Sequence, residues 1–222
     1  MADLTRFSQT LRLVPKVHWI VVEDSSSRSE NIELLLSRST ISHTLLWRKT
    51  PPHYPGKGWL PRSYALDFIR NHFRDQKDIS AVVFFGDDDN AYDLRLFTDY
   101  IRHVDSVGVW AVGLVGGAIV EAPKVDNGTV IGWNVLYAPR RKFATDMAGF
   151  AVHLNLILST NATFGPFCRR KSAPETCFLE QLGITLKDLK PFGFDNDRKE
   201  ILVWHTKTRN SGTKGDNYGF VV

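Results

Sequence analysis

The sequence has little of several features that would assign it quickly. Only two of its 222 residues are cysteines, Cys168 and Cys177, so their spacing gives neither a disulfide framework nor a metal site, and whether they pair with each other stays open. No run of 18 apolar residues occurs and no signal peptide is recognisable, so we predict no membrane span in this chain. Lysine and arginine form no dense block with interleaved aromatic residues, which argues against a nucleic-acid partner.

The residues that are present predict a single α/β domain. Hydrophobic residues make up 43% of the chain, enough for a sizeable core, and the net charge of +4 permits an anionic ligand without requiring one. Short apolar segments alternate with amphipathic ones, which favours a mostly parallel sheet flanked by helices, with antiparallel strands added in the second half. Strands are expected at residues 17–23, 43–47, 79–85, 107–115, 129–136 and 201–205, and helices at 4–11 (capped by Asp3), 63–73, 94–104 and 174–182.

Three consecutive aspartates, Asp87, Asp88 and Asp89, follow directly after the apolar segment 79–86. Adjacent carboxylates repel one another, and a nearby cation would relieve that repulsion. Oxygen ligands suit hard ions such as Mg²⁺ and Mn²⁺, and open α/β sheets bind ligands beyond the carboxyl ends of their strands. The run therefore indicates a metal–nucleotide site. The ordinary alternative is a polar turn after a strand, since aspartate favours turns, and the residues alone leave both open.

Other polar side chains stand at strand ends and in loops, and each also has an ordinary structural explanation. Asp24 ends the first strand and is expected on the same sheet edge as the three aspartates, where a carboxylate either binds a base or ribose or starts a turn. Glu175 follows Pro174 in the first turn of a helix, where it is either a partner of the helix dipole or a general base facing a cleft. The remaining candidates are the glycine-rich segment 113–117, Glu121, the basic pair Arg140 and Arg141, and His205 beside Lys207.

Five sequence blocks occur together and in a characteristic order. They are Val21-Val22-Glu23-Asp24, Asp87-Asp88-Asp89-Asn90, Val112-Gly113-Leu114-Val115-Gly116-Gly117, Asp146-Met147-Ala148-Gly149-Phe150-Ala151-Val152 and Val203-Trp204-His205-Thr206. With these blocks the chain closely resembles the β-1,3-glucuronyltransferases, over about residues 4–208. The resemblance implies a GT-A-like nucleotide-diphospho-sugar transferase fold, Mn²⁺ as cofactor, UDP-glucuronic acid as donor and a galactose-terminated glycan as acceptor. The implied reaction is an inverting transfer to the galactose 3-hydroxyl.

Carried over position by position, the resemblance implies a role for each candidate residue. Glu175 would be the general base and Asp89 the Mn²⁺ ligand. UDP would be held by Asp24, Arg62, Asp87, Asp88 and His205, and the acceptor by Glu121, Arg141 and Asp146. The single domain would divide into a UDP-binding half (about 1–110), an acceptor-binding half (about 111–206) and a polar tail (207–222). A homodimer and a Golgi membrane location, with the catalytic domain in the lumen, are also implied.

The chain departs from the family pattern at several points. Its likeness starts one helix into the family's order, so an opening strand and an aromatic loop that packs on uracil are expected to be missing. Tyr137 stands where the family often has tryptophan. Two other functions therefore stay open: a catalytically impaired relative that serves as a partner subunit, and a transferase that uses another UDP-sugar.

Overall fold

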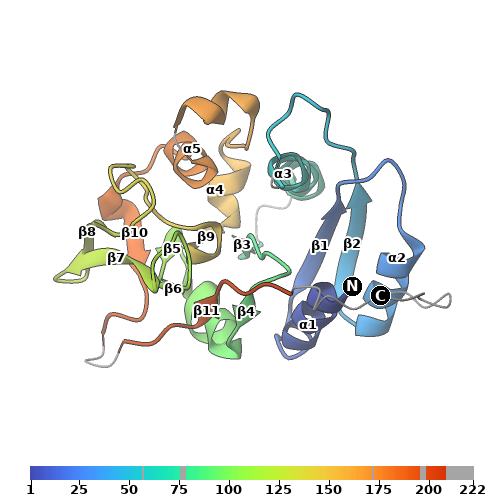
Figure 1. Ribbon diagram of the computed structural model, residues 1–222, viewed down its shortest axis with the longest axis horizontal. Helices are drawn as coiled ribbons and strands as arrows, with labels where there is room; N and C mark the ends of the chain where they lie inside the picture. Colours follow the sequence, from blue (N-terminus) through green and yellow to red (C-terminus); the bar gives the residue numbers. More distant parts are fainter. Residues whose placement is uncertain (57, 76–78, 172, 196–198, 209–222) are drawn as a thin grey trace.

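The computed structural model describes residues 1–56, 58–75, 79–171, 173–195 and 199–208. In Figure 1 the first two strands and their helices occupy one side of the molecule, and most of the later strands occupy the other. Helices α3, α4 and α5 lie along one edge in that view. Among the described residues, no helix is both long and apolar enough to cross a bilayer.

The amino-terminal part is a parallel strand pair joined by a helix. Its elements are α1 (Ala2–Leu11), β1 (His18–Glu23), α2 (Glu30–Ser39), β2 (Ser42–Trp47) and α3 (Trp59–Phe73). Helix α1 buries Leu4, Phe7 and Leu11, whose spacing places them on one helical face. A Cβ atom added at Gly86 would lie 2.6 Å from the Phe7 ring, so α1 packs directly against the segment that leads into the three aspartates.

The rest of the chain forms two further sheets with short strands. One has the order β10-β5-β9-β3, and the other has the order β4-β11-β6-β7-β8. The strands are β3 (Val82–Phe84), β4 (Ala91–Tyr92), β5 (Val107–Val109), β6 (Val112–Gly113), β7 (Val120–Asp126), β8 (Thr129–Asn134), β9 (Phe150–His153), β10 (Leu189–Pro191) and β11 (Val203–Trp204). The α-helices here are α4 (Leu154–Leu158) and α5 (Pro174–Gln181). Short 3₁₀ segments cover Met147–Gly149, Pro166–Lys171 and Leu186–Asp188.

The α/β class predicted from the sequence is confirmed, with corrections to its details. Three strand pairings between described residues are parallel and five are antiparallel, so the sheets are mixed rather than mostly parallel. The expected strand 107–115 is two strands, β5 and β6, because β5 pairs with β9 and β10 whereas β6 pairs with β7 and β11 in another sheet. The expected helix 94–104 is a π-helical turn, Leu96–Tyr100, followed by a 3₁₀ turn, Ile101–His103.

Two expectations about helices were also incomplete. Helix α1 begins at Ala2 after Met1, so Asp3 lies in its first turn rather than at its cap. Helix α2 was not predicted, although Ser29 caps it by accepting a hydrogen bond from the Ile32 N–H and apolar residues follow at helical spacing.

A cluster of aromatic rings fixes α5 against the end of β3. The Phe85 ring meets Phe178 edge-on with centroids 5.5 Å apart, and Phe178 stacks on Phe164 at 4.8 Å. Phe85 lies two residues before Asp87, and Phe178 lies three residues after Glu175. A disulfide between Cys168 and Cys177, the pairing that the sequence left open, further ties α5 to the segment before it.

Candidate functional site

The three aspartates lie in the loop between β3 and β4, and two neighbouring elements hold the first of them. Arg62 of α3 forms a short ion pair with the Asp87 carboxylate, and both side chains are mostly buried. The hydroxyl of Tyr92 in β4 donates to the Asp87 carbonyl at 2.8 Å. Ion pairs shielded from water are screened less by salt than exposed ones, so this contact fixes the loop more firmly than a surface pair would.

The backbone of Asp89 is held by residues from the two ends of the described chain. Arg6 donates from Nη2 to the Asp89 carbonyl at 2.8 Å, and the Thr206 hydroxyl donates to the same oxygen. Asp3 pairs with Arg6 at 2.9 Å and accepts a hydrogen bond from the hydroxyl of Thr208. These bonds use the carbonyl of Asp89 rather than its carboxylate. Helix α1 and the segment after β11 together orient the proposed metal-binding residue.

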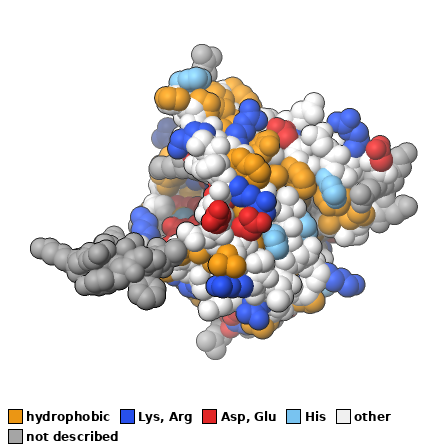
Figure 2. All heavy atoms as spheres, turned by 90° about the vertical axis from the view of Figure 1, so that its right-hand side faces the viewer, with side chains coloured by type: hydrophobic (Ala, Val, Ile, Leu, Met, Phe, Trp, Pro, Cys, Tyr) orange, Lys and Arg blue, Asp and Glu red, His pale blue; other side chains and the backbone are white. Residues whose placement is uncertain are grey.

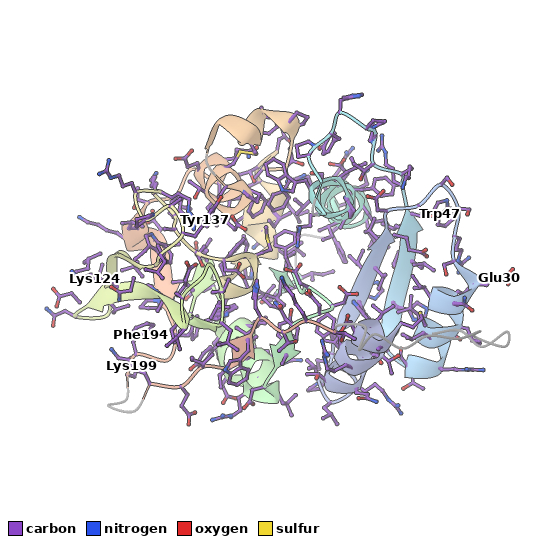
Figure 3. The ribbon with its side chains drawn as sticks, in the orientation of Figure 1. Glu30, Trp47, Lys124, Tyr137, Phe194 and Lys199 are labelled. Atoms are coloured by element: carbon purple, nitrogen blue, oxygen red, sulfur yellow. A yellow bond between two sulfur atoms is a disulfide. The ribbon has the colours of Figure 1, made fainter. Side chains whose placement is uncertain are left out.

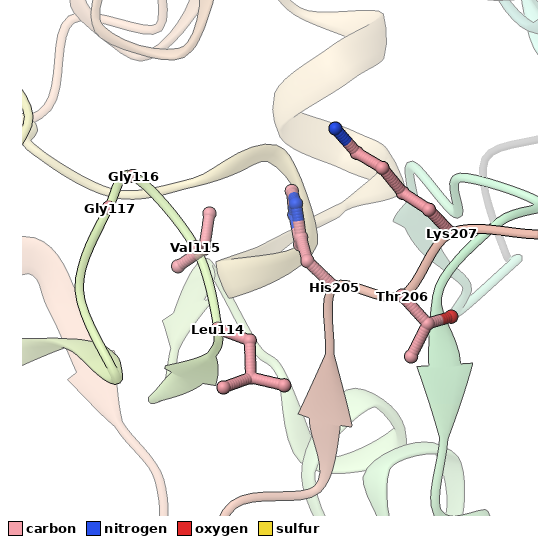
Figure 4. A pocket seen from close by; sticks show the side chains of 7 residues that line it. All are labelled: Leu114, Val115, Gly116, Gly117, His205, Thr206 and Lys207. Carbon is pink, nitrogen blue, oxygen red and sulfur yellow. The ribbon is translucent and has the colours of Figure 1, made fainter. Parts of the chain in front are cut away.

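A pocket of about 460 Å³ opens beside this junction. Residues 114–117 form one wall, and residues 205–207 form the other (Figure 4). His205 and Lys207 extend to the same side of the chain in Figure 4, and Thr206 between them points the other way, as the alternation of an extended segment requires. The pocket therefore has basic groups at one wall and a glycine-rich turn at the other, an arrangement suited to an anionic ligand.

Gly116 at this turn leaves room for Glu121. Gly116 has a φ of +61°, and a Cβ added there would lie 2.2 Å from Oε1 of Glu121. Glu121 is only 4% exposed, and its Oε1 accepts a hydrogen bond from the Tyr137 N–H at 3.3 Å. The glycine thus has both a conformational and a steric reason to be glycine. A side chain here would displace the buried Glu121 carboxylate that lies next to the pocket wall.

Asp146 and His205 form a hydrogen-bonded pair, with 3.0 Å between Oδ1 and Nε2. The same carboxylate accepts from the Ala148 N–H at 2.9 Å and caps the short helix Met147–Gly149. The bond from Asp146 raises the pKa of His205, and although burial opposes this effect, the net direction is upward. Burial has the largest single effect on Asp146 and would raise its pKa, but the hydrogen bond and attraction to His205, together with the backbone N–H groups of Met147 and Ala148, lower it overall. An imidazolium is therefore favoured at the pocket wall.

Glu175 is the most strongly perturbed carboxylate among the described residues. Its side chain is 13% exposed, and burial raises its pKa to about 7, with Asp146 adding to the rise and Arg141 and Arg62 opposing it. The Arg141 guanidinium lies 3.6 Å from the Glu175 carboxylate and 5.1 Å from the centre of the Tyr137 ring. A carboxylate with a pKa near neutrality can accept a proton during a reaction at physiological pH.

Thr176 anchors Glu175 to the loop that carries Arg141 and Asp146. Its hydroxyl donates to the Phe143 carbonyl at 2.8 Å, and the residue is 3% exposed. A buried bond of this kind is costly to leave unmade, so it fixes the first turn of α5 against that loop.

Asp24 is the one predicted site residue whose recorded contacts lie elsewhere. Its carboxylate accepts from the Thr50 N–H at 2.7 Å and lies 4.0 Å from the Lys49 ammonium, and these groups lower its pKa, the Thr50 bond most. The expectation that Asp24 shares a sheet edge with the three aspartates was wrong, because β1 pairs with β2 and β3 pairs with β9 in another sheet. On the face over β1, β2 and α2, charges of both signs lie next to each other (Figure 2).

The donor atoms of the aspartate loop fit a hard divalent cation. Partial desolvation raises the pKa of Asp88, and the nearby carboxylates of Asp89, Asp3 and Asp87 raise it further, so negative charge is crowded there. Within the described part of the chain, no three His, Cys, Asp or Glu side chains converge as a complete metal cage. Ions such as Mg²⁺ are often held by one or two carboxylates together with substrate phosphates, and Asp89 suits that mode.

Comparison with known proteins shows which family the chain belongs to. Residues 7–209 match glycosyltransferase family 43. The chain belongs to glycosyltransferase family 43. It is 43% identical over 215 residues to galactosylgalactosylxylosylprotein 3-beta-glucuronosyltransferase 2 of Rattus norvegicus, covering 93% of this chain and 64% of the relative. It is 42% identical over 218 residues to the sqv-8 enzyme of the same description from Caenorhabditis elegans, covering 93% and 60%.

A third family-43 relative is galactosylgalactosylxylosylprotein 3-beta-glucuronosyltransferase 1 of Homo sapiens, which is 39% identical over 231 residues, covering 96% of this chain and 68% of the relative. The chain thus spans about two thirds or slightly less of these proteins.

Sequence reasoning about this family-43 chain missed Arg6, Thr176 and Tyr92. Arg6 bonds the backbone of Asp89, which lies 83 residues away, so no local spacing could have pointed to it. Tyr92 and Thr176 act by single hydrogen bonds to carbonyl groups, which leave no pattern in the sequence. Of the ten residues predicted to form the site, the structure links nine through ion pairs, hydrogen bonds, contact or electrostatic influence, and His205 among them lines the pocket; Asp24 is the exception.

Proposed function

We propose that this chain transfers glucuronic acid from UDP-glucuronic acid to the 3-hydroxyl of a terminal galactose, with inversion at the anomeric carbon. The observation that carries the proposal is Glu175, a buried carboxylate with a pKa of about 7 that stands beside Arg141 and is electrostatically coupled to Asp146. The names of the family-43 relatives support glucuronosyl transfer onto galactosylgalactosylxylosylprotein.

Glu175 is proposed as the general base. In its ionised form it would take the proton from the acceptor hydroxyl as that oxygen attacks the anomeric carbon on the face opposite UDP. Arg141, 3.6 Å from the carboxylate, would keep the ionised form available and orient it. Glu121, Arg141 and Asp146 are proposed to bind the acceptor galactose, since all three are charged groups near the loop of residues 137–146.

The donor is proposed to bind between the aspartate loop and the wall formed by residues 205–207. His205, whose pKa is raised by Asp146, would meet the diphosphate as a cation, and Lys207 stands two residues on. Asp87, Asp88 and Arg62 are proposed to contact the uridine of UDP. A uridine contact from Asp24 stays a prediction from the sequence. Mn²⁺ held by Asp89 would supply Lewis-acid stabilisation of the charge on departing UDP.

The disulfide supports an oxidising compartment for this chain, because such bonds persist in the secretory pathway and are rare in the cytosol. A Golgi location with the site in the lumen is proposed on that basis and from the family. A homodimer remains a prediction, to be checked by light scattering of the purified chain.

The deciding experiment measures UDP release from UDP-glucuronic acid, with and without a galactoside, and with Mn²⁺ added or removed by a chelator. We expect release that needs both the galactoside and the metal, and that is lost in Asp89→Ala. The matched control is Asp99→Asn, an exposed aspartate whose carboxylate accepts a bond from Thr98, which should retain release. Folded protein without any release would favour the partner-subunit alternative, and release from UDP-glucose or UDP-galactose in its place would favour a different donor.

A further inference from the structure

Two segments outside the site carry the acceptor pattern for attachment of a glycan to asparagine. They are Asn127-Gly128-Thr129 and Asn161-Ala162-Thr163, and neither residue between asparagine and threonine is proline. The sequence pattern alone does not distinguish the two tripeptides. The structure separates them, because the enzyme that modifies the asparagine must bind the whole tripeptide, including its threonine hydroxyl.

The first tripeptide forms the tip of the β7–β8 hairpin. Asp126 pairs with Thr129, so Asn127 and Gly128 are the two turn residues, and both have positive φ, 46° and 73°. Such a two-residue turn matches the twist of the flanking strands and favours Asn-Gly. Residues 126–129 are all exposed. The hairpin projects from the body of the molecule in Figure 1, and Lys124 of β7 marks its outer edge in Figure 3.

The second tripeptide is bound into the fold on its backbone. Thr163 donates its N–H to Oε1 of Gln181 at 3.2 Å, and its carbonyl accepts from Nε2 of the same side chain at 2.9 Å. Arg70 donates to the carbonyls of Thr160 and Ala162, and Ala162 is only 1% exposed. Although the Asn161 residue itself is exposed, the tripeptide cannot be drawn into an enzyme's cleft without breaking these bonds.

The disulfide links this second segment to the chemistry of the compartment. Cys168 follows Thr163 by five residues and pairs with Cys177, which lies on α5 together with Gln181. The disulfide therefore holds α5 in the position from which Gln181 binds the backbone of Thr163. A chain that forms this bond is in an oxidising compartment, where asparagine glycosylation also takes place.

We propose that Asn127 carries an N-linked oligosaccharide and that Asn161 stays unmodified once its loop has closed. In the transfer, the Asn127 side-chain nitrogen bonds to the anomeric carbon of a polyprenyl-diphosphate-linked oligosaccharide. The anomeric C–O bond to the diphosphate breaks, the amide loses one proton, and the polyprenyl diphosphate leaves. The inference rests on the lumenal location in the proposed function, and it does not depend on the transferase reaction.

A glycan at this hairpin would lie clear of the proposed site. Glu121, beside Gly116 of the pocket wall, lies at the other end of β7 and pairs with Val112. At about 3.3 Å per strand residue, Asn127 is roughly 20 Å further along the hairpin. The modification should therefore leave the site accessible, and its loss should leave the reaction unchanged.

The test expresses the full chain behind a cleavable secretion signal in cultured eukaryotic cells and maps occupied asparagines by enzymatic glycan release in ¹⁸O-water and peptide mass spectrometry. We expect Asn127 to be occupied in most molecules and Asn161 in few. Asn127→Gln and Thr129→Ala should each remove the glycan, whereas Thr129→Ser should keep it. Asn161→Gln should leave the mobility of the protein unchanged.

A further variant tests why Asn161 is spared. Replacing both cysteines by serine should raise occupancy at Asn161 at least severalfold, because α5 no longer closes the loop covalently. Unchanged low occupancy would overturn the role of the disulfide, and high occupancy in the unmutated chain would overturn the protection of this loop. An unmodified Asn127 in secreted, disulfide-bonded protein would overturn the main proposal.

The outcome is separable from that of the proposed function. Glycan mapping needs no donor, acceptor or metal, so a protein that is glycosylated at Asn127 but releases no UDP would refute only the transferase. If Asn127 carries a glycan in the chain secreted behind the added signal but not in the chain from its native tissue, only the lumenal location would be refuted.

Discussion

The substitution Glu175→Gln should make the protein inactive and, above neutral pH, more stable. Glutamine has nearly the same shape as glutamate but cannot accept the proton of the acceptor hydroxyl. Turnover should therefore fall by roughly 10²–10⁴-fold, the usual contribution of general acid–base help. The affinity for UDP should change little, because Glu175 is proposed to act on the acceptor side. In the unmutated protein kcat/KM should rise with pH through about 7, where Glu175 becomes ionised.

The stability effect follows from the raised pKa of Glu175. The folded state holds the proton up to a pH of about 7, against a reference value of 4.5. Between these values the folded protein binds more protons than the unfolded chain, so stability falls as the pH rises. Above pH 7 the full penalty of the buried charge is about 3 kcal/mol, at roughly 1.36 kcal/mol for each pKa unit. This penalty already includes the attraction of Arg141, and neutral glutamine avoids it, so we expect a net gain of about 1–3 kcal/mol.

The measurement is thermal unfolding of both proteins at pH 5 and pH 8. At pH 8 the variant should melt higher by about 2–4 °C for each kcal/mol gained, and at pH 5 the difference should nearly vanish because Glu175 is then protonated. Glu180→Gln, the same change further along α5, is the control and should alter neither turnover nor the pH dependence. A variant that is less stable at pH 8, or one that keeps near-normal turnover, would refute the assignment of Glu175.

Three further predictions concern the contacts around the pocket. Arg6→Ala should weaken Mn²⁺-dependent UDP binding about tenfold, in line with the loss of a charged hydrogen bond to the Asp89 carbonyl, and Arg6→Lys should recover part of it; calorimetric titration with equal affinities would contradict this role. Asp146→Asn should lower the pKa of His205 and weaken UDP binding at pH 7 more than at pH 5.5, as NMR titration of the imidazole and binding curves would show. Removing the disulfide by paired serine substitutions should lower the free energy of unfolding by about 2–3 kcal/mol, and an unchanged urea midpoint would mean that packing alone holds α5.

The sequence predicted those parts of the fold that depend on local pattern. Strand β1 and helix α3 were located because their apolar residues repeat at the right spacing, and Glu175 falls in the first turn of α5, as Pro174 indicated. The pattern could not show that β11 would pair in parallel with β6 and antiparallel with β4, because pairing depends on residues about 90 or more positions apart.

The electrostatic interactions within the site could likewise not be predicted from the local sequence. The resemblance singled out Asp146 and His205, but their direct bond joins residues 59 positions apart. The raised pKa of Glu175 depends on burial by the packed fold, which no spacing of charged residues reveals. The disulfide is a similar case, since two cysteines nine positions apart pair only if the fold brings their Cα atoms close together, here to 5.4 Å.

The central place of β11 has a consequence for how the protein is made. This strand is the last in the described chain, yet it lies between β4 and β6, and the residues after it provide His205 and Lys207 at the pocket wall and the bond from Thr206 to Asp89. During synthesis β4 and β6 emerge first, so the place between them stays empty until residues 203–204 arrive and pair with both. The proposed donor site is thus completed only after residues 203–207 have been synthesised. A nascent chain that stalled before residue 203 would have almost the whole core but would lack the wall of residues 205–207 at the proposed donor site.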